Sequence, residues 1–480
     1  MNNLVGHLDS EITRSWTQST AAHPFIERLL PNTLLVPLAP HPKRDEIKWF
    51  HLLSAFRHNL IEGFPRQCWK RGVISVPFLG SKLVLVNSPE AIREMMVTKA
   101  EHFGRLSAGK RVLSPVVGSG LALSEGTDWK RQRRMLAPAF GPRSTPVIAT
   151  HVVRATNVAI NRLKLRSDQD TADLFSELGR LGLEIAAAAL FSMSNERHVS
   201  VIRDMMVMYG ASIGRPRVAD FIFPHWVPTP TQIRRTRFRR RLMQLIDTVI
   251  RDRAATFEPD NPRDLFDLLY HQMSGSAPDE MADHVSTMIA AGHETTAMTL
   301  FWALEILAQD PNLQKQVAWE AEAISHDPVL AGESLSQLRY TEAVVRETLR
   351  LFPQAFMIGR QAMTNTTVDG SAIPRGATVL VPIWMLHRNP HLWEQPDAFN
   401  PARFLGDNAP DRFSYLPFGA GPHVCIGAGL AITEATLVLA QFMRHFRISR
   451  VDDRPPTPMP SLSLRPDYSP RYALRPRDQA

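Results

Sequence analysis

The chain has 480 residues, of which 44% are hydrophobic and 21% charged, a composition typical of globular rather than disordered proteins. Its two cysteines, Cys68 and Cys425, exclude a disulfide framework, a four-cysteine zinc site and a cysteine-held iron–sulfur cluster, and they suit a reducing compartment. The net charge of +8 is partly due to an arginine-rich run at residues 234–241. We expect this run to be a solvated helix face rather than a nucleic-acid site, because apolar residues follow it at helical spacing.

No targeting or membrane-spanning segment is expected. Residues 1–20 carry Asp9, Glu11 and Arg14 and lack an apolar core, unlike a signal peptide. The longest stretch without Asp, Glu, Lys or Arg, residues 413–433, is interrupted by prolines and glycines, which argues against a transmembrane helix. We therefore predict a cytoplasmic protein.

The elements follow from hydrophobic periodicity. In chain order we expect strands at 73–78 and 82–86, helices at 90–99, 128–136, 147–165, 172–190, 231–254, 280–307, 313–324 and 337–350, a strand at 377–381 and a helix at 430–445. No repeat or low-complexity linker divides the chain. The predicted fold class is mainly α with small β-sheets (α+β), in one domain over 1–480 with irregular terminal segments at 1–40 and 452–480.

The helix expected at 128–136 carries Trp129 and Arg133, which are four residues apart and so share one helix face. Alone, such a pair is usually a packed tryptophan beside a solvated base.

Segment 291–296, Ala-Gly-His-Glu-Thr-Thr, lies midway along the apolar helix expected at 280–307. Polar groups in a core helix are costly unless they are used, and Gly292 lets another body approach the backbone. The alternatives are a satisfied core threonine and a packing glycine. A zinc HExxH motif is excluded because position 297 is alanine.

Glu347 and Arg350 lie three residues apart on one face of the helix expected at 337–350, with apolar flanks. An isolated pair of this kind is usually a weak surface pair. The apolar flanks also allow a buried ion pair with a structural role.

Segment 418–427 reads Phe-Gly-Ala-Gly-Pro-His-Val-Cys-Ile-Gly. Its glycines permit positive φ and close approach to a flat partner. The helix expected to begin near Ile426 points its positive end at Cys425, which favours the metal-binding thiolate. A dinucleotide fingerprint fails because Val424 occupies the third glycine position, whereas a buried structural cysteine stays open as an alternative.

These segments together resemble the cytochrome P-450 family, of the soluble bacterial type. The cysteine segment fits its FxxGxxxCxG signature, residues 347–350 its ExxR pair, residues 401–404 its PxRF segment, and residues 291–295 its (A/G)GxxT helix motif. Ala402 departs from the glutamate often found in PxRF, but Arg403 is retained. The matches run in the family order from Trp129 to Gly427.

The resemblance implies a site for heme b (iron protoporphyrin IX) between a long central helix and the helix after the cysteine loop. Cys425 would be the axial ligand to the iron, and Glu294 and Thr295 the acid–alcohol pair that guides protons. Glu347, Arg350 and Arg403 would form a structural ion-pair group. The other expected cofactor contacts are Trp129, Arg133, Ala291, Gly292, Arg360, Phe418, Gly419, His423 and Gly427.

The resemblance further implies a monomeric monooxygenase that inserts one oxygen atom of O2 into a hydrophobic small molecule. Its substrate pocket is expected to be lined by residues 354–358, which follow Pro353, by Ile289 and Ala290, and by the regions 104–120 and 205–226. Since the chain has no flavin or ferredoxin segment, electrons would come from a separate ferredoxin, flavodoxin or reductase. A haem-thiolate peroxygenase or rearrangement enzyme is the alternative, and a haem-based binding or sensor protein is a third hypothesis. The retained Glu294 and Thr295 disfavour both.

Overall fold

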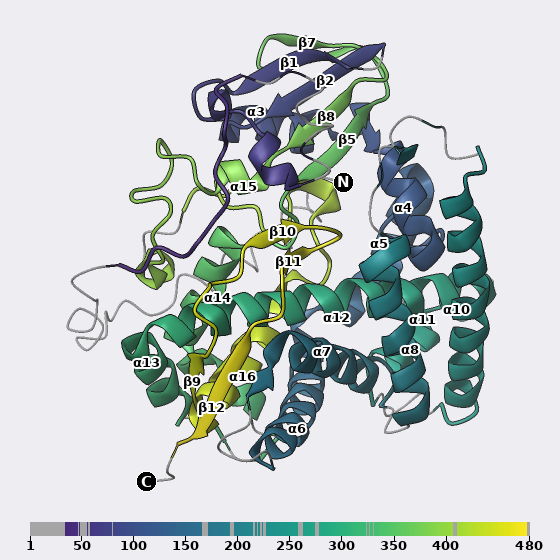
Figure 1. The fold of residues 1–480 in the computed structure, drawn as a ribbon. Helices are drawn as coiled ribbons and strands as arrows, with labels where there is room; N and C mark the ends of the chain where they lie inside the picture. The colour runs from purple at the N-terminus through teal and green to yellow at the C-terminus, as the bar shows by residue number, and fades with distance from the viewer. Residues whose placement is uncertain are drawn as a thin grey trace.

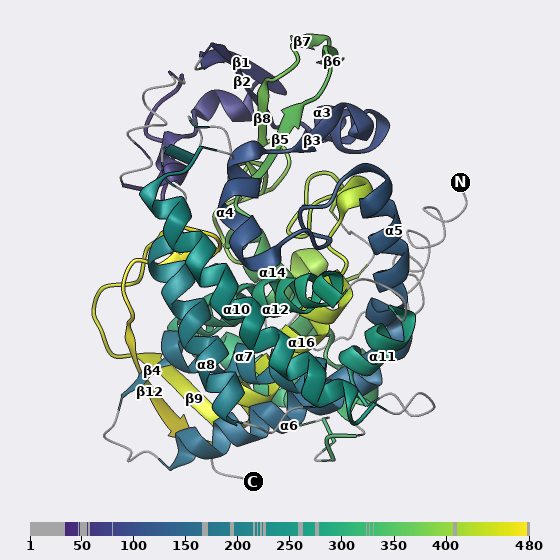
Figure 2. The same ribbon diagram turned by 90° about the vertical axis from the view of Figure 1, so that its right-hand side faces the viewer.

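The computed structural model describes residues 34–46, 48, 55, 58–78, 80–165, 171–192, 196–214, 217, 219, 220, 223, 227–257, 263–273, 278–322, 324, 325, 327–329, 331–406 and 410–477. A helical body is joined to a five-stranded sheet at one end (Figures 1 and 2). The predicted mainly helical architecture with small sheets is confirmed.

The α-helices form the helical body. They are α3 Pro89–Arg93, α4 Ser107–Val117, α5 Gly126–Leu136, α6 Thr145–Lys164, α7 Leu174–Phe191, α8 Glu196–Met208, α10 Pro230–Ala254, α11 Leu265–Gln272, α12 Pro278–Gln309, α13 Pro311–Ala321, α14 Arg339–Leu351, α15 Ile383–Leu386 and α16 Ala428–His445. Shorter helical turns that matter below are η3 Glu94–Thr98, η7 Tyr209–Ile213, η9 Pro401–Phe404 and η10 Gly421–His423.

The strands form four small sheets. They are β1 Val73–Phe78, β2 Ser81–Val86, β3 Phe103–Arg105, β4 Ala172–Asp173, β5 Ile358–Ala362, β6 Thr366–Val368, β7 Ser371–Ile373, β8 Thr378–Val381, β9 Phe446–Arg450, β10 Pro458–Pro460, β11 Leu464–Pro466 and β12 Arg471–Pro476. The largest sheet has the order β1-β2-β8-β5-β3, in which only the β2–β8 pair is parallel. Sheet β4-β12-β9 lies toward the opposite end of the molecule (Figures 1 and 2).

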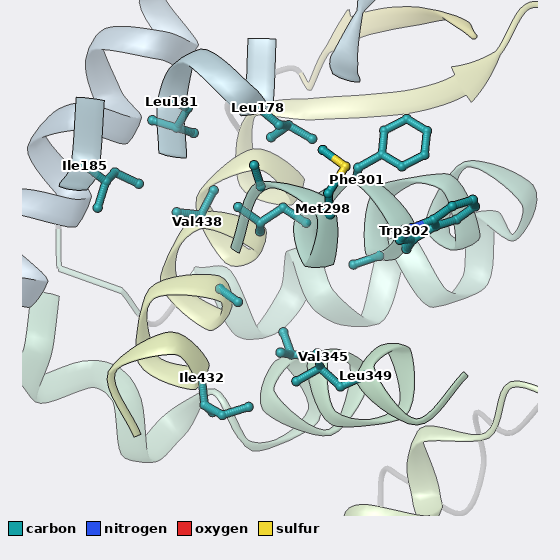
Figure 3. Packing of buried hydrophobic residues seen from close by; sticks show 14 of the residues in the cluster. Leu178, Leu181, Ile185, Met298, Phe301, Trp302, Val345, Leu349, Ile432 and Val438 are labelled. Carbon is teal, nitrogen blue, oxygen red and sulfur yellow. The ribbon is translucent and has the colours of Figure 1, made fainter. Parts of the chain in front are cut away.

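Helix α12 runs through the middle of the helical body (Figure 1). Its second half carries Met298, Phe301 and Trp302, which pack against α7, α14 and α16 (Figure 3). A helix that is apolar all round is stable only when other elements surround it. Helix α7 comes so close that a Cβ at Gly182 would lie 2.6 Å from the carbonyl oxygen of His293. Within the described residues, no helix combines the length and apolar content needed to cross a bilayer.

Two expectations about regular structure were wrong in part. The segment after 452 is not irregular over its described length, because β10, β11 and β12 lie there and bury Leu464 and Tyr472 completely. The strands there have only three to six residues. Because the segment is also rich in proline, an alternating hydrophobic pattern cannot be recognised in it. The single helix expected at 90–99 is divided into α3 and the π-helical turn η3. Residues 1–33 lie outside the described chain, and 34–40 carry no helix or strand.

The arginine-rich run lies on α10 and is only partly a solvated face. Arg234, Arg237 and Arg241 are exposed, as expected. Arg235, in contrast, is completely buried and its Nη1 lies 2.7 Å from Oδ1 of Asp220. The difference arises because a continuous basic run must turn some residues inward on a helix that packs against neighbours.

Candidate functional site

The cysteine segment forms a tight loop before α16. The backbone N–H of Cys425 donates to the carbonyl of Phe418 at 2.9 Å. Gly419 and Gly421 adopt φ of 74° and 69°, where a side chain would be strained. A Cβ at Gly421 would also lie 2.0 Å from the carbonyl oxygen of Met96. The positive φ values expected of these glycines are confirmed. Helix α16 begins at Ala428, between the two expected starts near Ile426 and at residue 430.

Cys425 is exposed to solvent although protein surrounds most of the thiol. Burial raises the pKa of this thiol, and the N–H of Gly427 and the charge of Arg133 oppose that effect without cancelling it. The N–H of Gly427 and the charge of Arg133 are thus not enough to favour the thiolate over the thiol. A metal cation would, since a coordinating thiol gives up its proton.

Helix α5 brings a tryptophan and an arginine onto this loop. Arg133 Nη1 donates to the carbonyl of Val424 at 2.8 Å, and the ring of Trp129 lies 4.2 Å from that of His423, centroid to centroid. Arg134, one residue further on α5, is exposed. The shared helix face predicted for Trp129 and Arg133 is therefore the face turned to the cysteine loop.

A second pair of arginines comes from neighbouring strands. Arg105 on β3 lies directly opposite Arg360 on β5 in an antiparallel pair, and Arg105 Nη2 is 3.2 Å from Nδ1 of His423. Like charges placed directly opposite each other destabilise a sheet. Burial, reinforced by Arg105, lowers the pKa of Arg360 to about 10, and burial beside both arginines lowers the pKa of His423 to about 3.

The cationic cluster consists of Arg105, Arg133 and Arg360 together with His423, which is neutral at its lowered pKa. Its nearby carboxylate is Glu125, whose Oε1 accepts the backbone N–H of Arg105 at 2.5 Å and whose Oε2 pairs with Lys110. The buried Nε of Arg105 has no hydrogen-bond partner in the described structure. This donor set requires an anionic ligand, and the two propionates of haem meet that requirement. Arg105 was missed by sequence reasoning, because a three-residue strand carries no motif.

The middle of α12 presents an accessible face. Ala291 is exposed, whereas Ile289 and Ala297 on either side are 2% and 0% exposed. A Cβ at Gly292 would have no heavy atom within 4 Å, and Thr295 Oγ1 donates to the carbonyl of Ala291 at 2.6 Å. A flat ligand could therefore approach this stretch of α12 closely.

Glu294 points elsewhere. Its carboxylate accepts a hydrogen bond from Arg465 Nε at 2.7 Å and another from Ser463 Oγ. Both partners lie in or beside the β10–β11 hairpin, in the segment that the sequence left irregular. The acid of the expected acid–alcohol pair is thus held in an ion pair that sequence reasoning missed.

The structure brings Glu347, Arg350 and Arg403 together. Glu347 and Arg350 are completely buried and joined at 2.7 and 2.8 Å. Arg403 Nε, on η9, lies 3.4 Å from Glu347 Oε1, as an ion pair rather than a well-formed hydrogen bond. The guanidinium of Arg350 also donates to the carbonyls of His387, Pro396 and Ala398, so it ties α14 to the loop before η9.

The stretch after Pro353 was expected to line a substrate pocket. Gln354 is instead buried and used structurally, with Nε2 donating to the carbonyl of Phe352 and Oε1 accepting the N–H of Leu464. Ala355 is exposed, and Met357 and Ile358 are half-buried. These three residues therefore remain candidates for lining the substrate pocket. Of the residues expected to line the pocket at 205–226, several lie outside the described residues.

Comparison with known proteins agrees with this geometry. The sequence model of the cytochrome P450 family matches residues 40–472. Cyclooctat-9-en-7-ol 5-monooxygenase of Streptomyces melanosporofaciens is 32% identical over 381 residues, which cover 77% of this chain and 81% of that protein. Cyclooctatin synthase of the same bacterium is 32% identical, covering 78% and 83% of the two chains. A cytokinin hydroxylase of Arabidopsis thaliana is 28% identical, covering 81% and 78%.

The family holds haem through a cysteine thiolate, and its members include the monooxygenases and hydroxylases just described. The match begins ahead of β1 and reaches into β12, and it therefore takes in the cysteine loop, the cationic cluster and the buried Glu347 group. This chain belongs to the cytochrome P450 family and is a haem-dependent monooxygenase.

Proposed function

We propose that this cytochrome P450 inserts one oxygen atom of O2 into a hydrophobic small molecule, that the thiolate of Cys425 would hold the haem iron, and that electrons come from a separate ferredoxin, flavodoxin or reductase. The observation that carries this proposal is an accessible cysteine beside a half-buried group of three arginines, whose nearby carboxylate among the described residues is Glu125 and in which Arg105 Nε has no hydrogen-bond partner. Haem b, when bound, supplies the oxygen activation, and the residues of the chain supply its binding and surroundings.

The chain's own groups have separate tasks in this proposal. Arg105, Arg133, Arg360 and His423 bind the propionate carboxylates by charge-assisted hydrogen bonds. Ala291 and Gly292 on α12 would leave room for the haem ring, and the loop residues Phe418, Gly419 and Gly427 would contact it beside Cys425. This division of tasks is supported by the exposure of Ala291 and by the open space beside Gly292.

Glu294 and Thr295 move protons to the reacting oxygen. The hydroxyl of Thr295 lies at the accessible face of α12, and the neighbouring carboxylate can pass protons through water. Met357 and Ile358 present apolar surface to the substrate. Because two relatives are named for cyclooctat-9-en-7-ol and cyclooctatin, carbocyclic compounds of low polarity are the first substrates to test.

The experiment compares two oxygen sources. Compounds are first screened for the optical spin shift that accompanies binding near the iron, and the best ligand is then incubated with ¹⁸O2, NADPH, a ferredoxin and a ferredoxin reductase. We expect labelled oxygen in the product. Turnover with hydrogen peroxide alone would make the protein a peroxygenase, and binding without turnover under either condition would make it a binding or sensor protein.

Replacing Arg133 by glutamine is expected to weaken haem binding about 10- to 100-fold. The physical reason is the loss of a hydrogen bond to a charged group, which contributes about 1.5–3 kcal/mol. The measurement is the rate of haem transfer to apomyoglobin. Arg134→Gln is the matched control, because Arg134 is exposed on the same helix; equal transfer rates for the two variants would contradict the role given to Arg133.

A further inference from the structure

Hydrogen bonds hold the β10–β11 hairpin against α12 and neighbouring segments. Its strands pair Met459 with Arg465. Leu464, completely buried, accepts a hydrogen bond from Trp302 Nε1 of α12 at 2.8 Å and donates its N–H to Gln354 Oε1. Asn59 Nδ2 donates to the carbonyl of Pro458 at 2.8 Å. The hairpin, visible beside α12 in Figure 1, therefore holds its side chains in fixed positions relative to that helix.

Two side chains of this hairpin segment converge on one oxygen atom of Glu294. Arg465 Nε donates to Oε1 at 2.7 Å, and Ser463 Oγ donates to the same atom. The side chains of Arg465 and Glu294 are 17% and 14% exposed. An ion pair this far removed from solvent is screened less than a surface pair.

Helical turn η7 closes over the same ion pair. A Cβ at Gly210 would lie 2.2 Å from Arg465 Nη2 and 3.3 Å from Glu294 Oε2. A side chain at this position would force the guanidinium of Arg465 to shift away from η7. Thus the Glu294 carboxylate is enclosed by α12, by the hairpin segment and by η7.

These surroundings determine the protonation state of Glu294. Burial pushes the pKa of Glu294 upward, but the hydrogen bonds and charge of Arg465, with help from Ser463 and His293, outweigh it and leave the pKa below its ordinary value. The stability that Glu294 contributes is fully present above the unfolded-state pKa, roughly 4.3. It is lost only as the pH falls through the lower folded-state value. The group is therefore an ionised carboxylate near neutral pH.

We infer that Arg465 and Ser463 are positioning residues for proton delivery: they hold the Glu294 carboxylate ionised and away from the accessible face of α12 until it is required. The inference rests on the proton role proposed for Glu294. It adds that the β10–β11 hairpin, and not only α12, controls that role.

Without Arg465, the buried carboxyl loses its cation and becomes protonated near neutral pH. In Arg465→Gln we expect a new infrared band of a protonated carboxyl group at neutral pH, absent from the wild type and from the Arg465→Gln/Glu294→Gln double variant. This readout does not depend on turnover. If the single variant shows no such band, or if the double variant keeps it, the inference is wrong.

The functional arm uses holoenzyme with NADPH, a ferredoxin and its reductase, and measures hydrogen peroxide released per NADPH oxidised and the pH profile of NADPH oxidation. We expect Arg465→Gln to raise the peroxide yield, to lower the oxidation rate about 10-fold and to shift the acidic limb of the profile toward neutral pH. Arg465→Lys should restore most of the wild-type values. The effects of Arg465→Gln and Glu294→Gln should not add, because both act through one carboxylate.

The matched control is Arg454→Gln. Arg454 forms a 2.7 Å ion pair with Asp467 in the same C-terminal segment, but its side chain is 59% exposed, so its loss should leave all readouts unchanged.

A second variant, Ser463→Ala, tests the inference even if Arg465→Gln folds poorly. It removes one hydrogen bond to Glu294 without changing any charge, and it should also raise the peroxide yield. If Glu294→Gln changes nothing, the proposed proton role fails. If Glu294→Gln has its effect while the Arg465 and Ser463 variants behave like wild type, only the inference fails.

Discussion

Replacing Glu347 by glutamine is expected to lower the free energy of unfolding by about 3–5 kcal/mol, because it leaves the buried guanidinium of Arg350 without its counter-charge. Arg350 would keep its bonds to the carbonyls of His387, Pro396 and Ala398, but these neutral acceptors do not replace a carboxylate. Such a loss is a large share of the roughly 5–15 kcal/mol that stabilises a typical protein. Urea denaturation of the purified holoprotein, with the yield of haem-loaded protein, would measure it.

The control for this prediction lies on the same helix. Glu342 pairs with Arg346 at 2.6 Å and is 39% exposed. Glu342→Gln should cost only about 0.3–0.5 kcal/mol, the usual value of an exposed pair four residues apart. Equal denaturation midpoints for the Glu347 and Glu342 variants would show that burial does not give the Glu347 pair its importance.

Replacing Cys425 by alanine is expected to lower turnover by more than about 10³-fold, since removing even a single preorganised hydrogen-bond donor costs about 10²–10³ and this change removes the thiolate that we propose as the iron ligand. The reduced, carbon monoxide-bound protein should also lose the red-shifted absorption band typical of thiolate ligation. Both quantities are measured on the purified variant after haem reconstitution.

The other cysteine provides the comparison. Cys68 is buried, and burial raises the pKa of its thiol to about 12, so it is not available as a thiolate. Cys68→Ala should keep the absorption band and the turnover of the wild type. A Cys425 variant that kept both properties would remove the basis of the ligand assignment.

The long helices could be predicted from the sequence because their burial pattern repeats along the chain. Helix α12 was expected at 280–307 and spans Pro278–Gln309. Helix α4 was not predicted, since Gly109 and Pro115 lie within it and both residues are unfavourable inside helices. Strand β3 has three residues, too few to show an alternation.

For the site, residues joined by a fixed spacing could be predicted, and residues joined only by the fold could not. Glu347 and Arg350 are three residues apart, so their pairing follows from helix geometry. Arg105 meets Arg360, and Arg465 meets Glu294, through contacts between distant segments. No local pattern marks such partners, because the chain path between them decides whether they meet.

The cationic cluster gathers side chains from four separate stretches of the chain, on β3, α5, β5 and the cysteine loop. A single small molecule that engages all four acts as a cross-link between them. By mass action, a ligand present at a thousand times its dissociation constant adds about 4 kcal/mol to the folded state. The supply of prosthetic group during biosynthesis therefore governs how much of this polypeptide survives proteolysis, as well as how much of it is active.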